Sequence, residues 1–141
     1  EVGDWSSDVC SSDLDIKYAD NEISYKYSGI SDYAEVNRAA LMEMVGQKGF
    51  LKIGRGGLAE KGVLVRHMVL PGNIENTKQC LDFIAEKLSS EMFLSLMAQY
   101  HPAYRFSGFP ELAGGITREE YEEALEHLER LNLENGWKQE L

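Results

Sequence analysis

The run from Gly62 to Asn73 constrains the fold of this chain more than any other segment. Val63–Leu70 is largely apolar around one arginine, Arg66, and the run ends at Pro71-Gly72, a dipeptide typical of a turn. This pattern predicts a strand. An apolar strand would bury the charge of Arg66 unless the guanidinium met a carboxylate or a phosphate. We therefore expect this strand to contribute to a site for an anion-bearing ligand.

Strand and helix signals alternate along the rest of the chain. The predicted strands are 15–18, 63–70 and 93–98. The predicted helices are 21–27, 32–46, 76–88 and 117–131. Parallel strands joined by right-handed crossovers lie side by side, with their carboxyl ends at one edge. The alternation therefore predicts an α/β fold of parallel strands with outer helices, equivalent to half of a (β/α) barrel.

Capping residues set the expected helix ends. Asp32, with Glu35 three residues later, predicts an N-cap, and Gly46 predicts the end of the same helix. Asn76 predicts the N-cap of the following helix. The glycine-rich stretch 47–62 between these helices is expected to form an excursion with a small hairpin.

Apolar residues at helical spacing indicate which helix faces are buried. The residues expected on these faces are Val36, Ala39, Ala40, Val45, Leu81, Phe83, Ile84, Leu88, Tyr121, Leu125, Leu128 and Leu131. Thr117 and Glu120 match a capping box at the start of the last helix. The glutamates of that helix are expected to form a solvated outer face.

Composition excludes several classes of function. The 141 residues are 43% hydrophobic, which is enough for the core of one globular domain, and no apolar run approaches the roughly 20 residues that span a bilayer. The formal charge of −10 argues against nucleic-acid binding, since phosphate backbones favour lysine and arginine clusters. Cys10 and Cys80 have no metal-ligand spacing and indicate a reducing compartment. We expect a cytoplasmic protein with no membrane partner.

Residues 1–14 differ from everything that follows. They repeat Ser-Ser-Asp without helical or strand periodicity, and Asp4–Leu14 equals the translation of one frame of a common sequencing adapter. We interpret 1–14 as an adapter artefact and exclude it from the predicted elements. A disordered polar tail is the alternative. On the first interpretation, residues 15–141 are one domain that starts inside a strand and continues upstream in a longer protein.

Three motifs together resemble the C-terminal half of the radical S-adenosylmethionine (SAM) enzymes. They are Asp15-Ile16-Lys17, the strand with Arg66 that ends in Pro71-Gly72-Asn73, and Gln99-Tyr100-His101-Pro102. Within that family, the chain is most similar to proteins related to pyruvate formate-lyase-activating enzyme. The resemblance covers residues 15 to about 133.

The resemblance implies a partial (β/α) barrel that binds SAM and a 4Fe-4S cluster. In this family the cluster donates one electron that cleaves SAM to methionine and a 5′-deoxyadenosyl radical, and some members install a glycyl radical on a partner protein. Carried over by position, Asp15 and Lys17 would line the SAM pocket at a strand end. Arg66 would contact the methionine carboxylate or the ribose, and His101 would lie near the adenosyl group.

The chain departs from the family in its cysteines. Radical SAM enzymes hold the cluster with Cys-x-x-x-Cys-x-x-Cys, which does not occur in this sequence. Cys80 falls on a predicted apolar helix face and is expected to be a core residue. We therefore expect this chain to be inactive alone, as part of a parent enzyme that binds the cluster.

Simpler interpretations of the site residues stay open. Arg66 could pair with a surface carboxylate, Asp15 and Lys17 could form a solvated strand end, and His101 could be a loop histidine. The alternative function is a non-catalytic α/β module that binds an anionic ligand or a protein partner.

Overall fold

A mostly parallel sheet forms the centre of the molecule. The computed structural model describes residues 10–50, 52–53, 59–98, 110–112, 115–133 and 135–138. Four strands run parallel in the order β1 (Cys10–Asp15), β3 (Ala59–Met68), β4 (Phe93–Met97) and β5 (Gly136–Lys138). The short strand β2 (Lys52–Ile53) pairs antiparallel with β3. The described residues thus form an α/β fold with a parallel sheet, as the sequence predicts.

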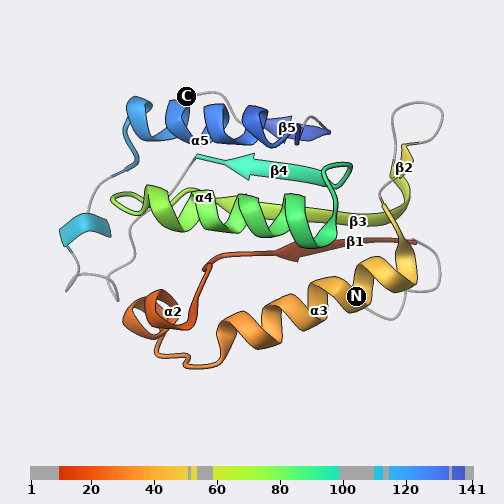
Figure 1. Cartoon of the computed structure of the whole chain (residues 1–141), viewed down its shortest axis with the longest axis horizontal. Coiled ribbons are helices and arrows are strands. Elements are labelled where there is room, and N and C mark those ends of the chain that lie inside the picture. The colour runs from red at the N-terminus through yellow and green to blue at the C-terminus, as the bar shows by residue number, and fades with distance from the viewer. Residues whose placement is uncertain are drawn as a thin grey trace.

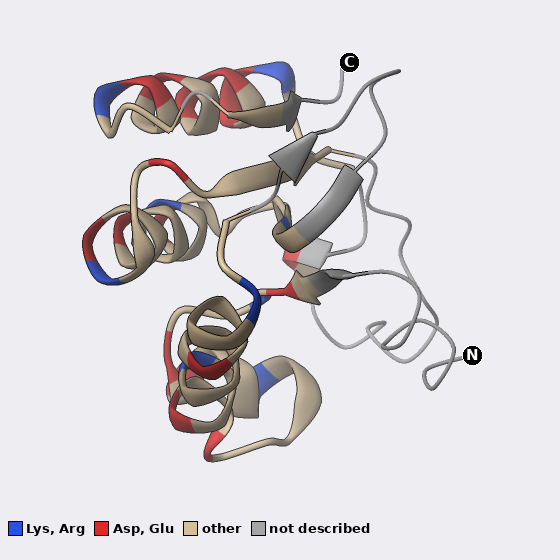
Figure 2. Ribbon diagram, turned by 90° about the vertical axis from the view of Figure 1, so that its right-hand side faces the viewer, with Lys and Arg blue, Asp and Glu red and all other residues tan. Residues whose placement is uncertain are grey.

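Helices connect successive strands (Figure 1). They are α2 (Asn21–Ser28), α3 (Tyr33–Lys48), α4 (Ile74–Phe83) with a π-helical extension η2 (Ile84–Leu88), the 3-10 turn η4 (Pro110–Leu112) and α5 (Arg118–Arg130). Figure 2 shows α3, α4 and α5 on the same side of the sheet. None of the helices in the described ranges is sufficiently long and apolar to cross a membrane.

The strands alternate between a face that packs against the helices and a face that does not. On β3 and β4 the helix-facing side chains are buried: Val63, Val65, His67, Leu94 and Leu96. They join one core with helix residues such as Leu41, Leu81 and Leu128. The intervening residues are only partly buried: Leu64, Arg66, Met68, Phe93, Ser95 and Met97. We call this second side the open face. The helices α3, α4 and α5 lie on the other side of the sheet (Figure 2), and Met68, at the end of β3, packs against a cluster that includes Tyr27 of α2.

Several predicted local features are confirmed. The Thr117 side chain accepts from the backbone N–H of Glu120 at 3.0 Å, and the Glu120 carboxylate accepts from the backbone N–H of Thr117 at 2.9 Å. Tyr121 and Leu128 are buried on the inner face of α5, and Cys80 is fully buried in the core. The β2–β3 pairing is the small hairpin expected in the glycine-rich stretch.

Two predicted helix boundaries are wrong. Gly46 lies inside α3, and the helix ends at Gly49, whose positive φ of 75° suits a residue without a Cβ. The N-cap of α4 is Asn73, not Asn76, because the turn at Gly72 already directs the chain into the helix.

The predicted buried face of α3 is wrong at Val36, Ala39 and Ala40, which are exposed, whereas Val45 packs partly buried against the core. Val36 is 60% exposed, and the buried residues of this helix are Ala34 and Leu41. The reason is that α3 packs on β1 and β3 through Leu41, Met44 and Val45, which places Val36 on the solvent side.

The first and last strands differ from the prediction. β1 spans Cys10–Asp15, so the prediction of a strand over 15–18 is wrong: only Asp15 of that range is in the strand, and residues 10–14, outside the predicted elements, pair with β3. The adapter origin of residues 1–14 stays a prediction. β5 was not predicted, because the three residues of Gly136–Lys138 are too few to show a strand period.

Candidate functional site

Two of the predicted site residues meet on the open face of the sheet. Asp15 and Arg66 are register partners on β1 and β3, and Arg66 Nε donates to Asp15 Oδ1 at 2.7 Å. Both side chains are accessible, at 42% exposure for Arg66 and 60% for Asp15. The register continues from Arg66 to Ser95 on β4. The expected carboxylate partner of Arg66 is thus a residue of the chain itself, and the pair remains open to solvent.

Lys17 lies just beyond the end of β1, and hydrogen bonds to its backbone groups hold it in place. Its N–H donates to the Tyr33 hydroxyl at 2.8 Å, and its carbonyl oxygen accepts from the Asn76 side-chain amide at 3.0 Å. The Lys17 Nζ lies 5.5 Å from the centroid of the Tyr18 ring. His101, the fourth predicted site residue, lies outside the described residues.

His67 follows Arg66 but points to the opposite face of the sheet. Its Nδ1 donates to the backbone oxygen of Ile16 at 2.7 Å, and its Nε2 accepts from the Thr77 hydroxyl, with 2.9 Å between the atoms. Burial lowers the pKa of His67 to about 4, so the ring is neutral at pH 7. His67 therefore ties β1 to α4 as a structural residue, as expected for a side chain that alternates away from Arg66.

Asn76 fixes the segment that leaves β1. Its Oδ1 accepts from the backbone N–H of Ala19 at 2.7 Å, while its Nδ2 donates to the Lys17 carbonyl. Both bonds join residues almost sixty positions apart, and Asn76 is 5% exposed. The amide thereby satisfies two backbone groups that would otherwise be unpaired at the strand end.

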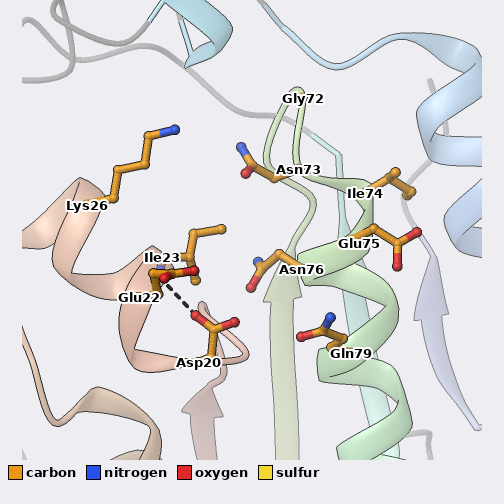
Figure 3. A pocket seen from close by; sticks show the side chains of 10 residues that line it. All are labelled: Asp20, Glu22, Ile23, Lys26, Gly72, Asn73, Ile74, Glu75, Asn76 and Gln79. Atoms are coloured by element: carbon orange, nitrogen blue, oxygen red, sulfur yellow. Dashed lines mark hydrogen bonds between the residues drawn. The ribbon is translucent and has the colours of Figure 1, made fainter.

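An open cleft of about 480 Å³ lies beyond the carboxyl ends of β1 and β3, between α2 and α4 (Figure 3). Seven of its ten lining residues are polar or charged; the ten are Asp20, Glu22, Ile23, Lys26, Gly72, Asn73, Ile74, Glu75, Asn76 and Gln79. Ligands of parallel α/β sheets commonly bind outside the carboxyl ends of the strands. The acids Glu22 and Glu75 lie in the first turns of α2 and α4, where they also interact favourably with the helix dipoles.

A network of four residues closes one end of this cleft. The Tyr27 hydroxyl donates to Glu111 Oε2 at 2.5 Å, and Lys26 Nζ lies 3.0 Å from the same oxygen. Asn73 Nδ2 donates to the Tyr27 hydroxyl at 3.1 Å. The bonds from Tyr27 and then Lys26 hold the pKa of Glu111 at about 2, so its carboxylate is charged at neutral pH.

No pattern in the sequence predicts this network. Tyr27 and Glu111 are 84 positions apart, and Glu111 belongs to a short 3-10 turn without a periodic signal. A partial signal exists at Gly72, because glycine permits its φ of 72° and leaves space for Glu111. A Cβ at Gly72 would lie 3.0 Å from the Glu111 Cβ.

The described residues do not supply ligands for an iron–sulfur cluster. Such clusters need several thiolates at fixed spacing. Cys80 is fully buried in the core, and this burial raises the pKa of its thiol. Among the described residues, no three His, Cys, Asp or Glu side chains are grouped so that they could hold a metal ion. Cys80 thus does not fit the role of cluster ligand.

Comparison with known proteins adds one relative. Over 121 residues, the chain is 27% identical to the uncharacterized protein MJ0674 of Methanocaldococcus jannaschii. The match covers 85% of this chain and 31% of that protein, so the chain spans about a third of its relative's length. No protein-family model and no solved structure matches the chain.

Proposed function

We propose that this chain is the C-terminal part of a partial (β/α) barrel of radical SAM type, and that its open face lines the SAM pocket of the parent enzyme. The proposal rests on the pair of Asp15 and Arg66. These two residues carry two of the three motifs that resemble the family, and they meet at 2.7 Å on the open face of the parallel sheet.

The residues at this position suit the polar parts of SAM. An accessible guanidinium can donate to the methionine carboxylate, and an accessible carboxylate can accept from ribose hydroxyls or from the methionine ammonium. In the proposal Asp15 orients Arg66 when SAM is absent and shares it with the cofactor when SAM binds. Lys17 would contribute from the carboxyl end of β1, and the resemblance assigns His101 to the adenosyl group.

The cluster is assigned to another part of the parent. Within the family, the cluster and SAM together supply a radical that abstracts hydrogen from a substrate. Cys80 does not fit as a ligand, so we derive no step of this chemistry from the described residues. A glycyl-radical protein is one substrate that the resemblance suggests.

Sequencing the source gene across the codons for residues 1–15 is the first test. We expect the reading frame to continue upstream of Asp15 through a Cys-x-x-x-Cys-x-x-Cys motif. A start codon directly before Glu1 would contradict the proposal and favour the alternative, a module that binds an anionic ligand without radical chemistry.

Binding of SAM to the protein expressed from the complete frame is the second test. We expect saturable binding of SAM and weaker binding of 5′-deoxyadenosine, which lacks the methionine carboxylate that Arg66 would contact. Equal affinity for SAM and 5′-deoxyadenosine would mean that Arg66 does not contact the methionine carboxylate.

A further inference from the structure

The contacts around Glu111 have the composition of an anion-binding site. One carboxylate oxygen receives a hydrogen bond from Tyr27 and an ion pair from Lys26, at 2.5 Å and 3.0 Å. Tyr27 is 7% exposed, so its hydroxyl is a buried donor with a fixed direction. Charge-assisted bonds of this kind are stronger than bonds between neutral groups.

Asn73 fixes the direction of the tyrosine hydroxyl. Its Nδ2 donates to the Tyr27 oxygen at 3.1 Å and also to the Pro71 carbonyl at 2.9 Å. The hydroxyl oxygen accepts from Asn73, and its proton is directed to Glu111 Oε2 at 2.5 Å because the other acceptor, Asn73 Oδ1, is 3.5 Å away. The donors come from α2 and from the loop after β3, whereas the carboxylate comes from the separate turn η4. The donors are therefore arranged by elements other than the one that provides the anion.

We propose that Lys26, Tyr27 and Asn73 form an anion site of which Glu111 is the built-in occupant, and that a carboxylate or phosphate group of a small ligand can replace it. The contact is then autoinhibitory: η4 occupies the site until a ligand displaces the Glu111 side chain.

The adjoining cleft offers space for the rest of such a ligand. Lys26 and Asn73 line both the cleft and the anion site, and Lys26 lies at the end of the cleft away from Gln79 (Figure 3). Asp20 and Glu75 on the remaining wall disfavour a second anionic group. The site therefore suits a molecule with one anionic group and a polar, uncharged body. This inference does not depend on the proposed function: of its residues only Asn73 falls within a SAM motif, and the proposed function gives Asn73 no role.

Chemical rescue tests the proposal. Glu111→Ala removes the occupant and leaves the donors, so acetate or inorganic phosphate should raise the melting temperature of this variant in a saturable way. Sodium chloride at equal ionic strength should not. Adding Tyr27→Phe to Glu111→Ala should abolish the rescue. Glu119→Ala removes an exposed glutamate of α5 and serves as the control that acetate and phosphate do not stabilise.

Hydrogen exchange of the unsubstituted chain provides a test that does not depend on the folding of the variant. Saturating phosphate should increase deuterium uptake in peptides that contain 110–112, while Tyr27 and its neighbours in α2 stay protected. Equal stabilisation of Glu111→Ala by chloride would overturn the proposal, as would unchanged exchange at 110–112 in phosphate. Glu111 would then be a structural tie only.

Discussion

Asp15 and Arg66 occupy paired positions on two neighbouring parallel strands, and their side chains meet at 2.7 Å on the open face. Because the register fixes which residues face each other, a one-residue shift of β1 would point Asp15 to the opposite face. Exposed ion pairs contribute only about 0–1 kcal/mol to stability. Substitutions of Asp15 or Arg66 can therefore test ligand binding with only a small change in the free energy of unfolding.

Arg66→Ala in the complete protein should weaken SAM binding by about 1.5–3 kcal/mol, the usual loss for a hydrogen bond to a charged group. The free energy of unfolding should change by less than about 1 kcal/mol, because the side chain is accessible. Titration calorimetry with SAM and urea unfolding measure the two quantities. Arg118→Ala, at an exposed arginine of α5, is the matched control, and an identical SAM affinity in both variants would exclude Arg66 from the pocket.

The burial of His67 predicts that the free energy of unfolding decreases as the pH falls. Burial lowers its folded-state pKa to about 4, whereas an unfolded histidine titrates near 6.5. Between these values the unfolded chain binds more protons, so the free energy of unfolding decreases as the pH falls from about 6.5 to 4. The contribution is on the order of 3 kcal/mol over this range.

Urea unfolding at a series of pH values between 4 and 7 checks this dependence. His67→Gln should be less stable near neutral pH, since it disturbs the bonds to Ile16 and Thr77, but its stability should vary less with pH. A dependence that survives His67→Gln unchanged would assign it to other groups.

Tyr27→Phe should lower the free energy of unfolding by about 1–2 kcal/mol, because Glu111 and Asn73 each lose a hydrogen-bond partner. Tyr25→Phe in the same helix removes a hydroxyl from a side chain that is 64% exposed, and it should have little effect. Chemical denaturation of the two variants measures the difference. Equal stabilities would mean that solvent replaces the lost bonds at Tyr27.

Replacing Gly72 and Gly46 by alanine should change the stability of the chain in opposite directions. Gly72→Ala should destabilise the chain by about 1–2 kcal/mol, because φ is 72° and the new Cβ would lie 3.0 Å from the Glu111 Cβ. Gly46→Ala should stabilise it by about 0.5–1 kcal/mol, since Gly46 lies inside α3 with no atom within 4 Å of the added Cβ. Thermal unfolding of both variants tests the pair, and a stabilising Gly72→Ala would contradict the close approach of η4.

Local signals in the sequence are sufficient to predict most of the strands and helices. The alternation of buried and half-buried residues in β4 and the capping box at Thr117 depend on neighbours within a few positions, so they can be read directly. The end of α3 could not be read in this way. Gly46 and Gly49 are both plausible helix ends, and tertiary packing of the last turn decides between them.

The candidate sites depend on contacts between distant residues. The sequence predicted that Arg66 needs an anionic partner, and the strand pairing identifies it as Asp15. No pattern in the sequence links Tyr27 to Glu111, because their contact follows from the packing of η4 on α2. Asn76 was expected to cap a helix, whereas its amide binds the backbone of residues 17 and 19.

The pairing of β1 with β3 has a consequence for the order of folding. Asp15 and Arg66 are 51 positions apart, and the entropy lost on closing a loop grows with its length. The strands β3 and β4, joined through α4 alone, enclose a shorter loop. We therefore expect the unit of β3, α4 and β4 to form first and β1 to dock last, with His67 and Asn76 already positioned to receive it. The open-face ion pair would then form only when folding is nearly complete.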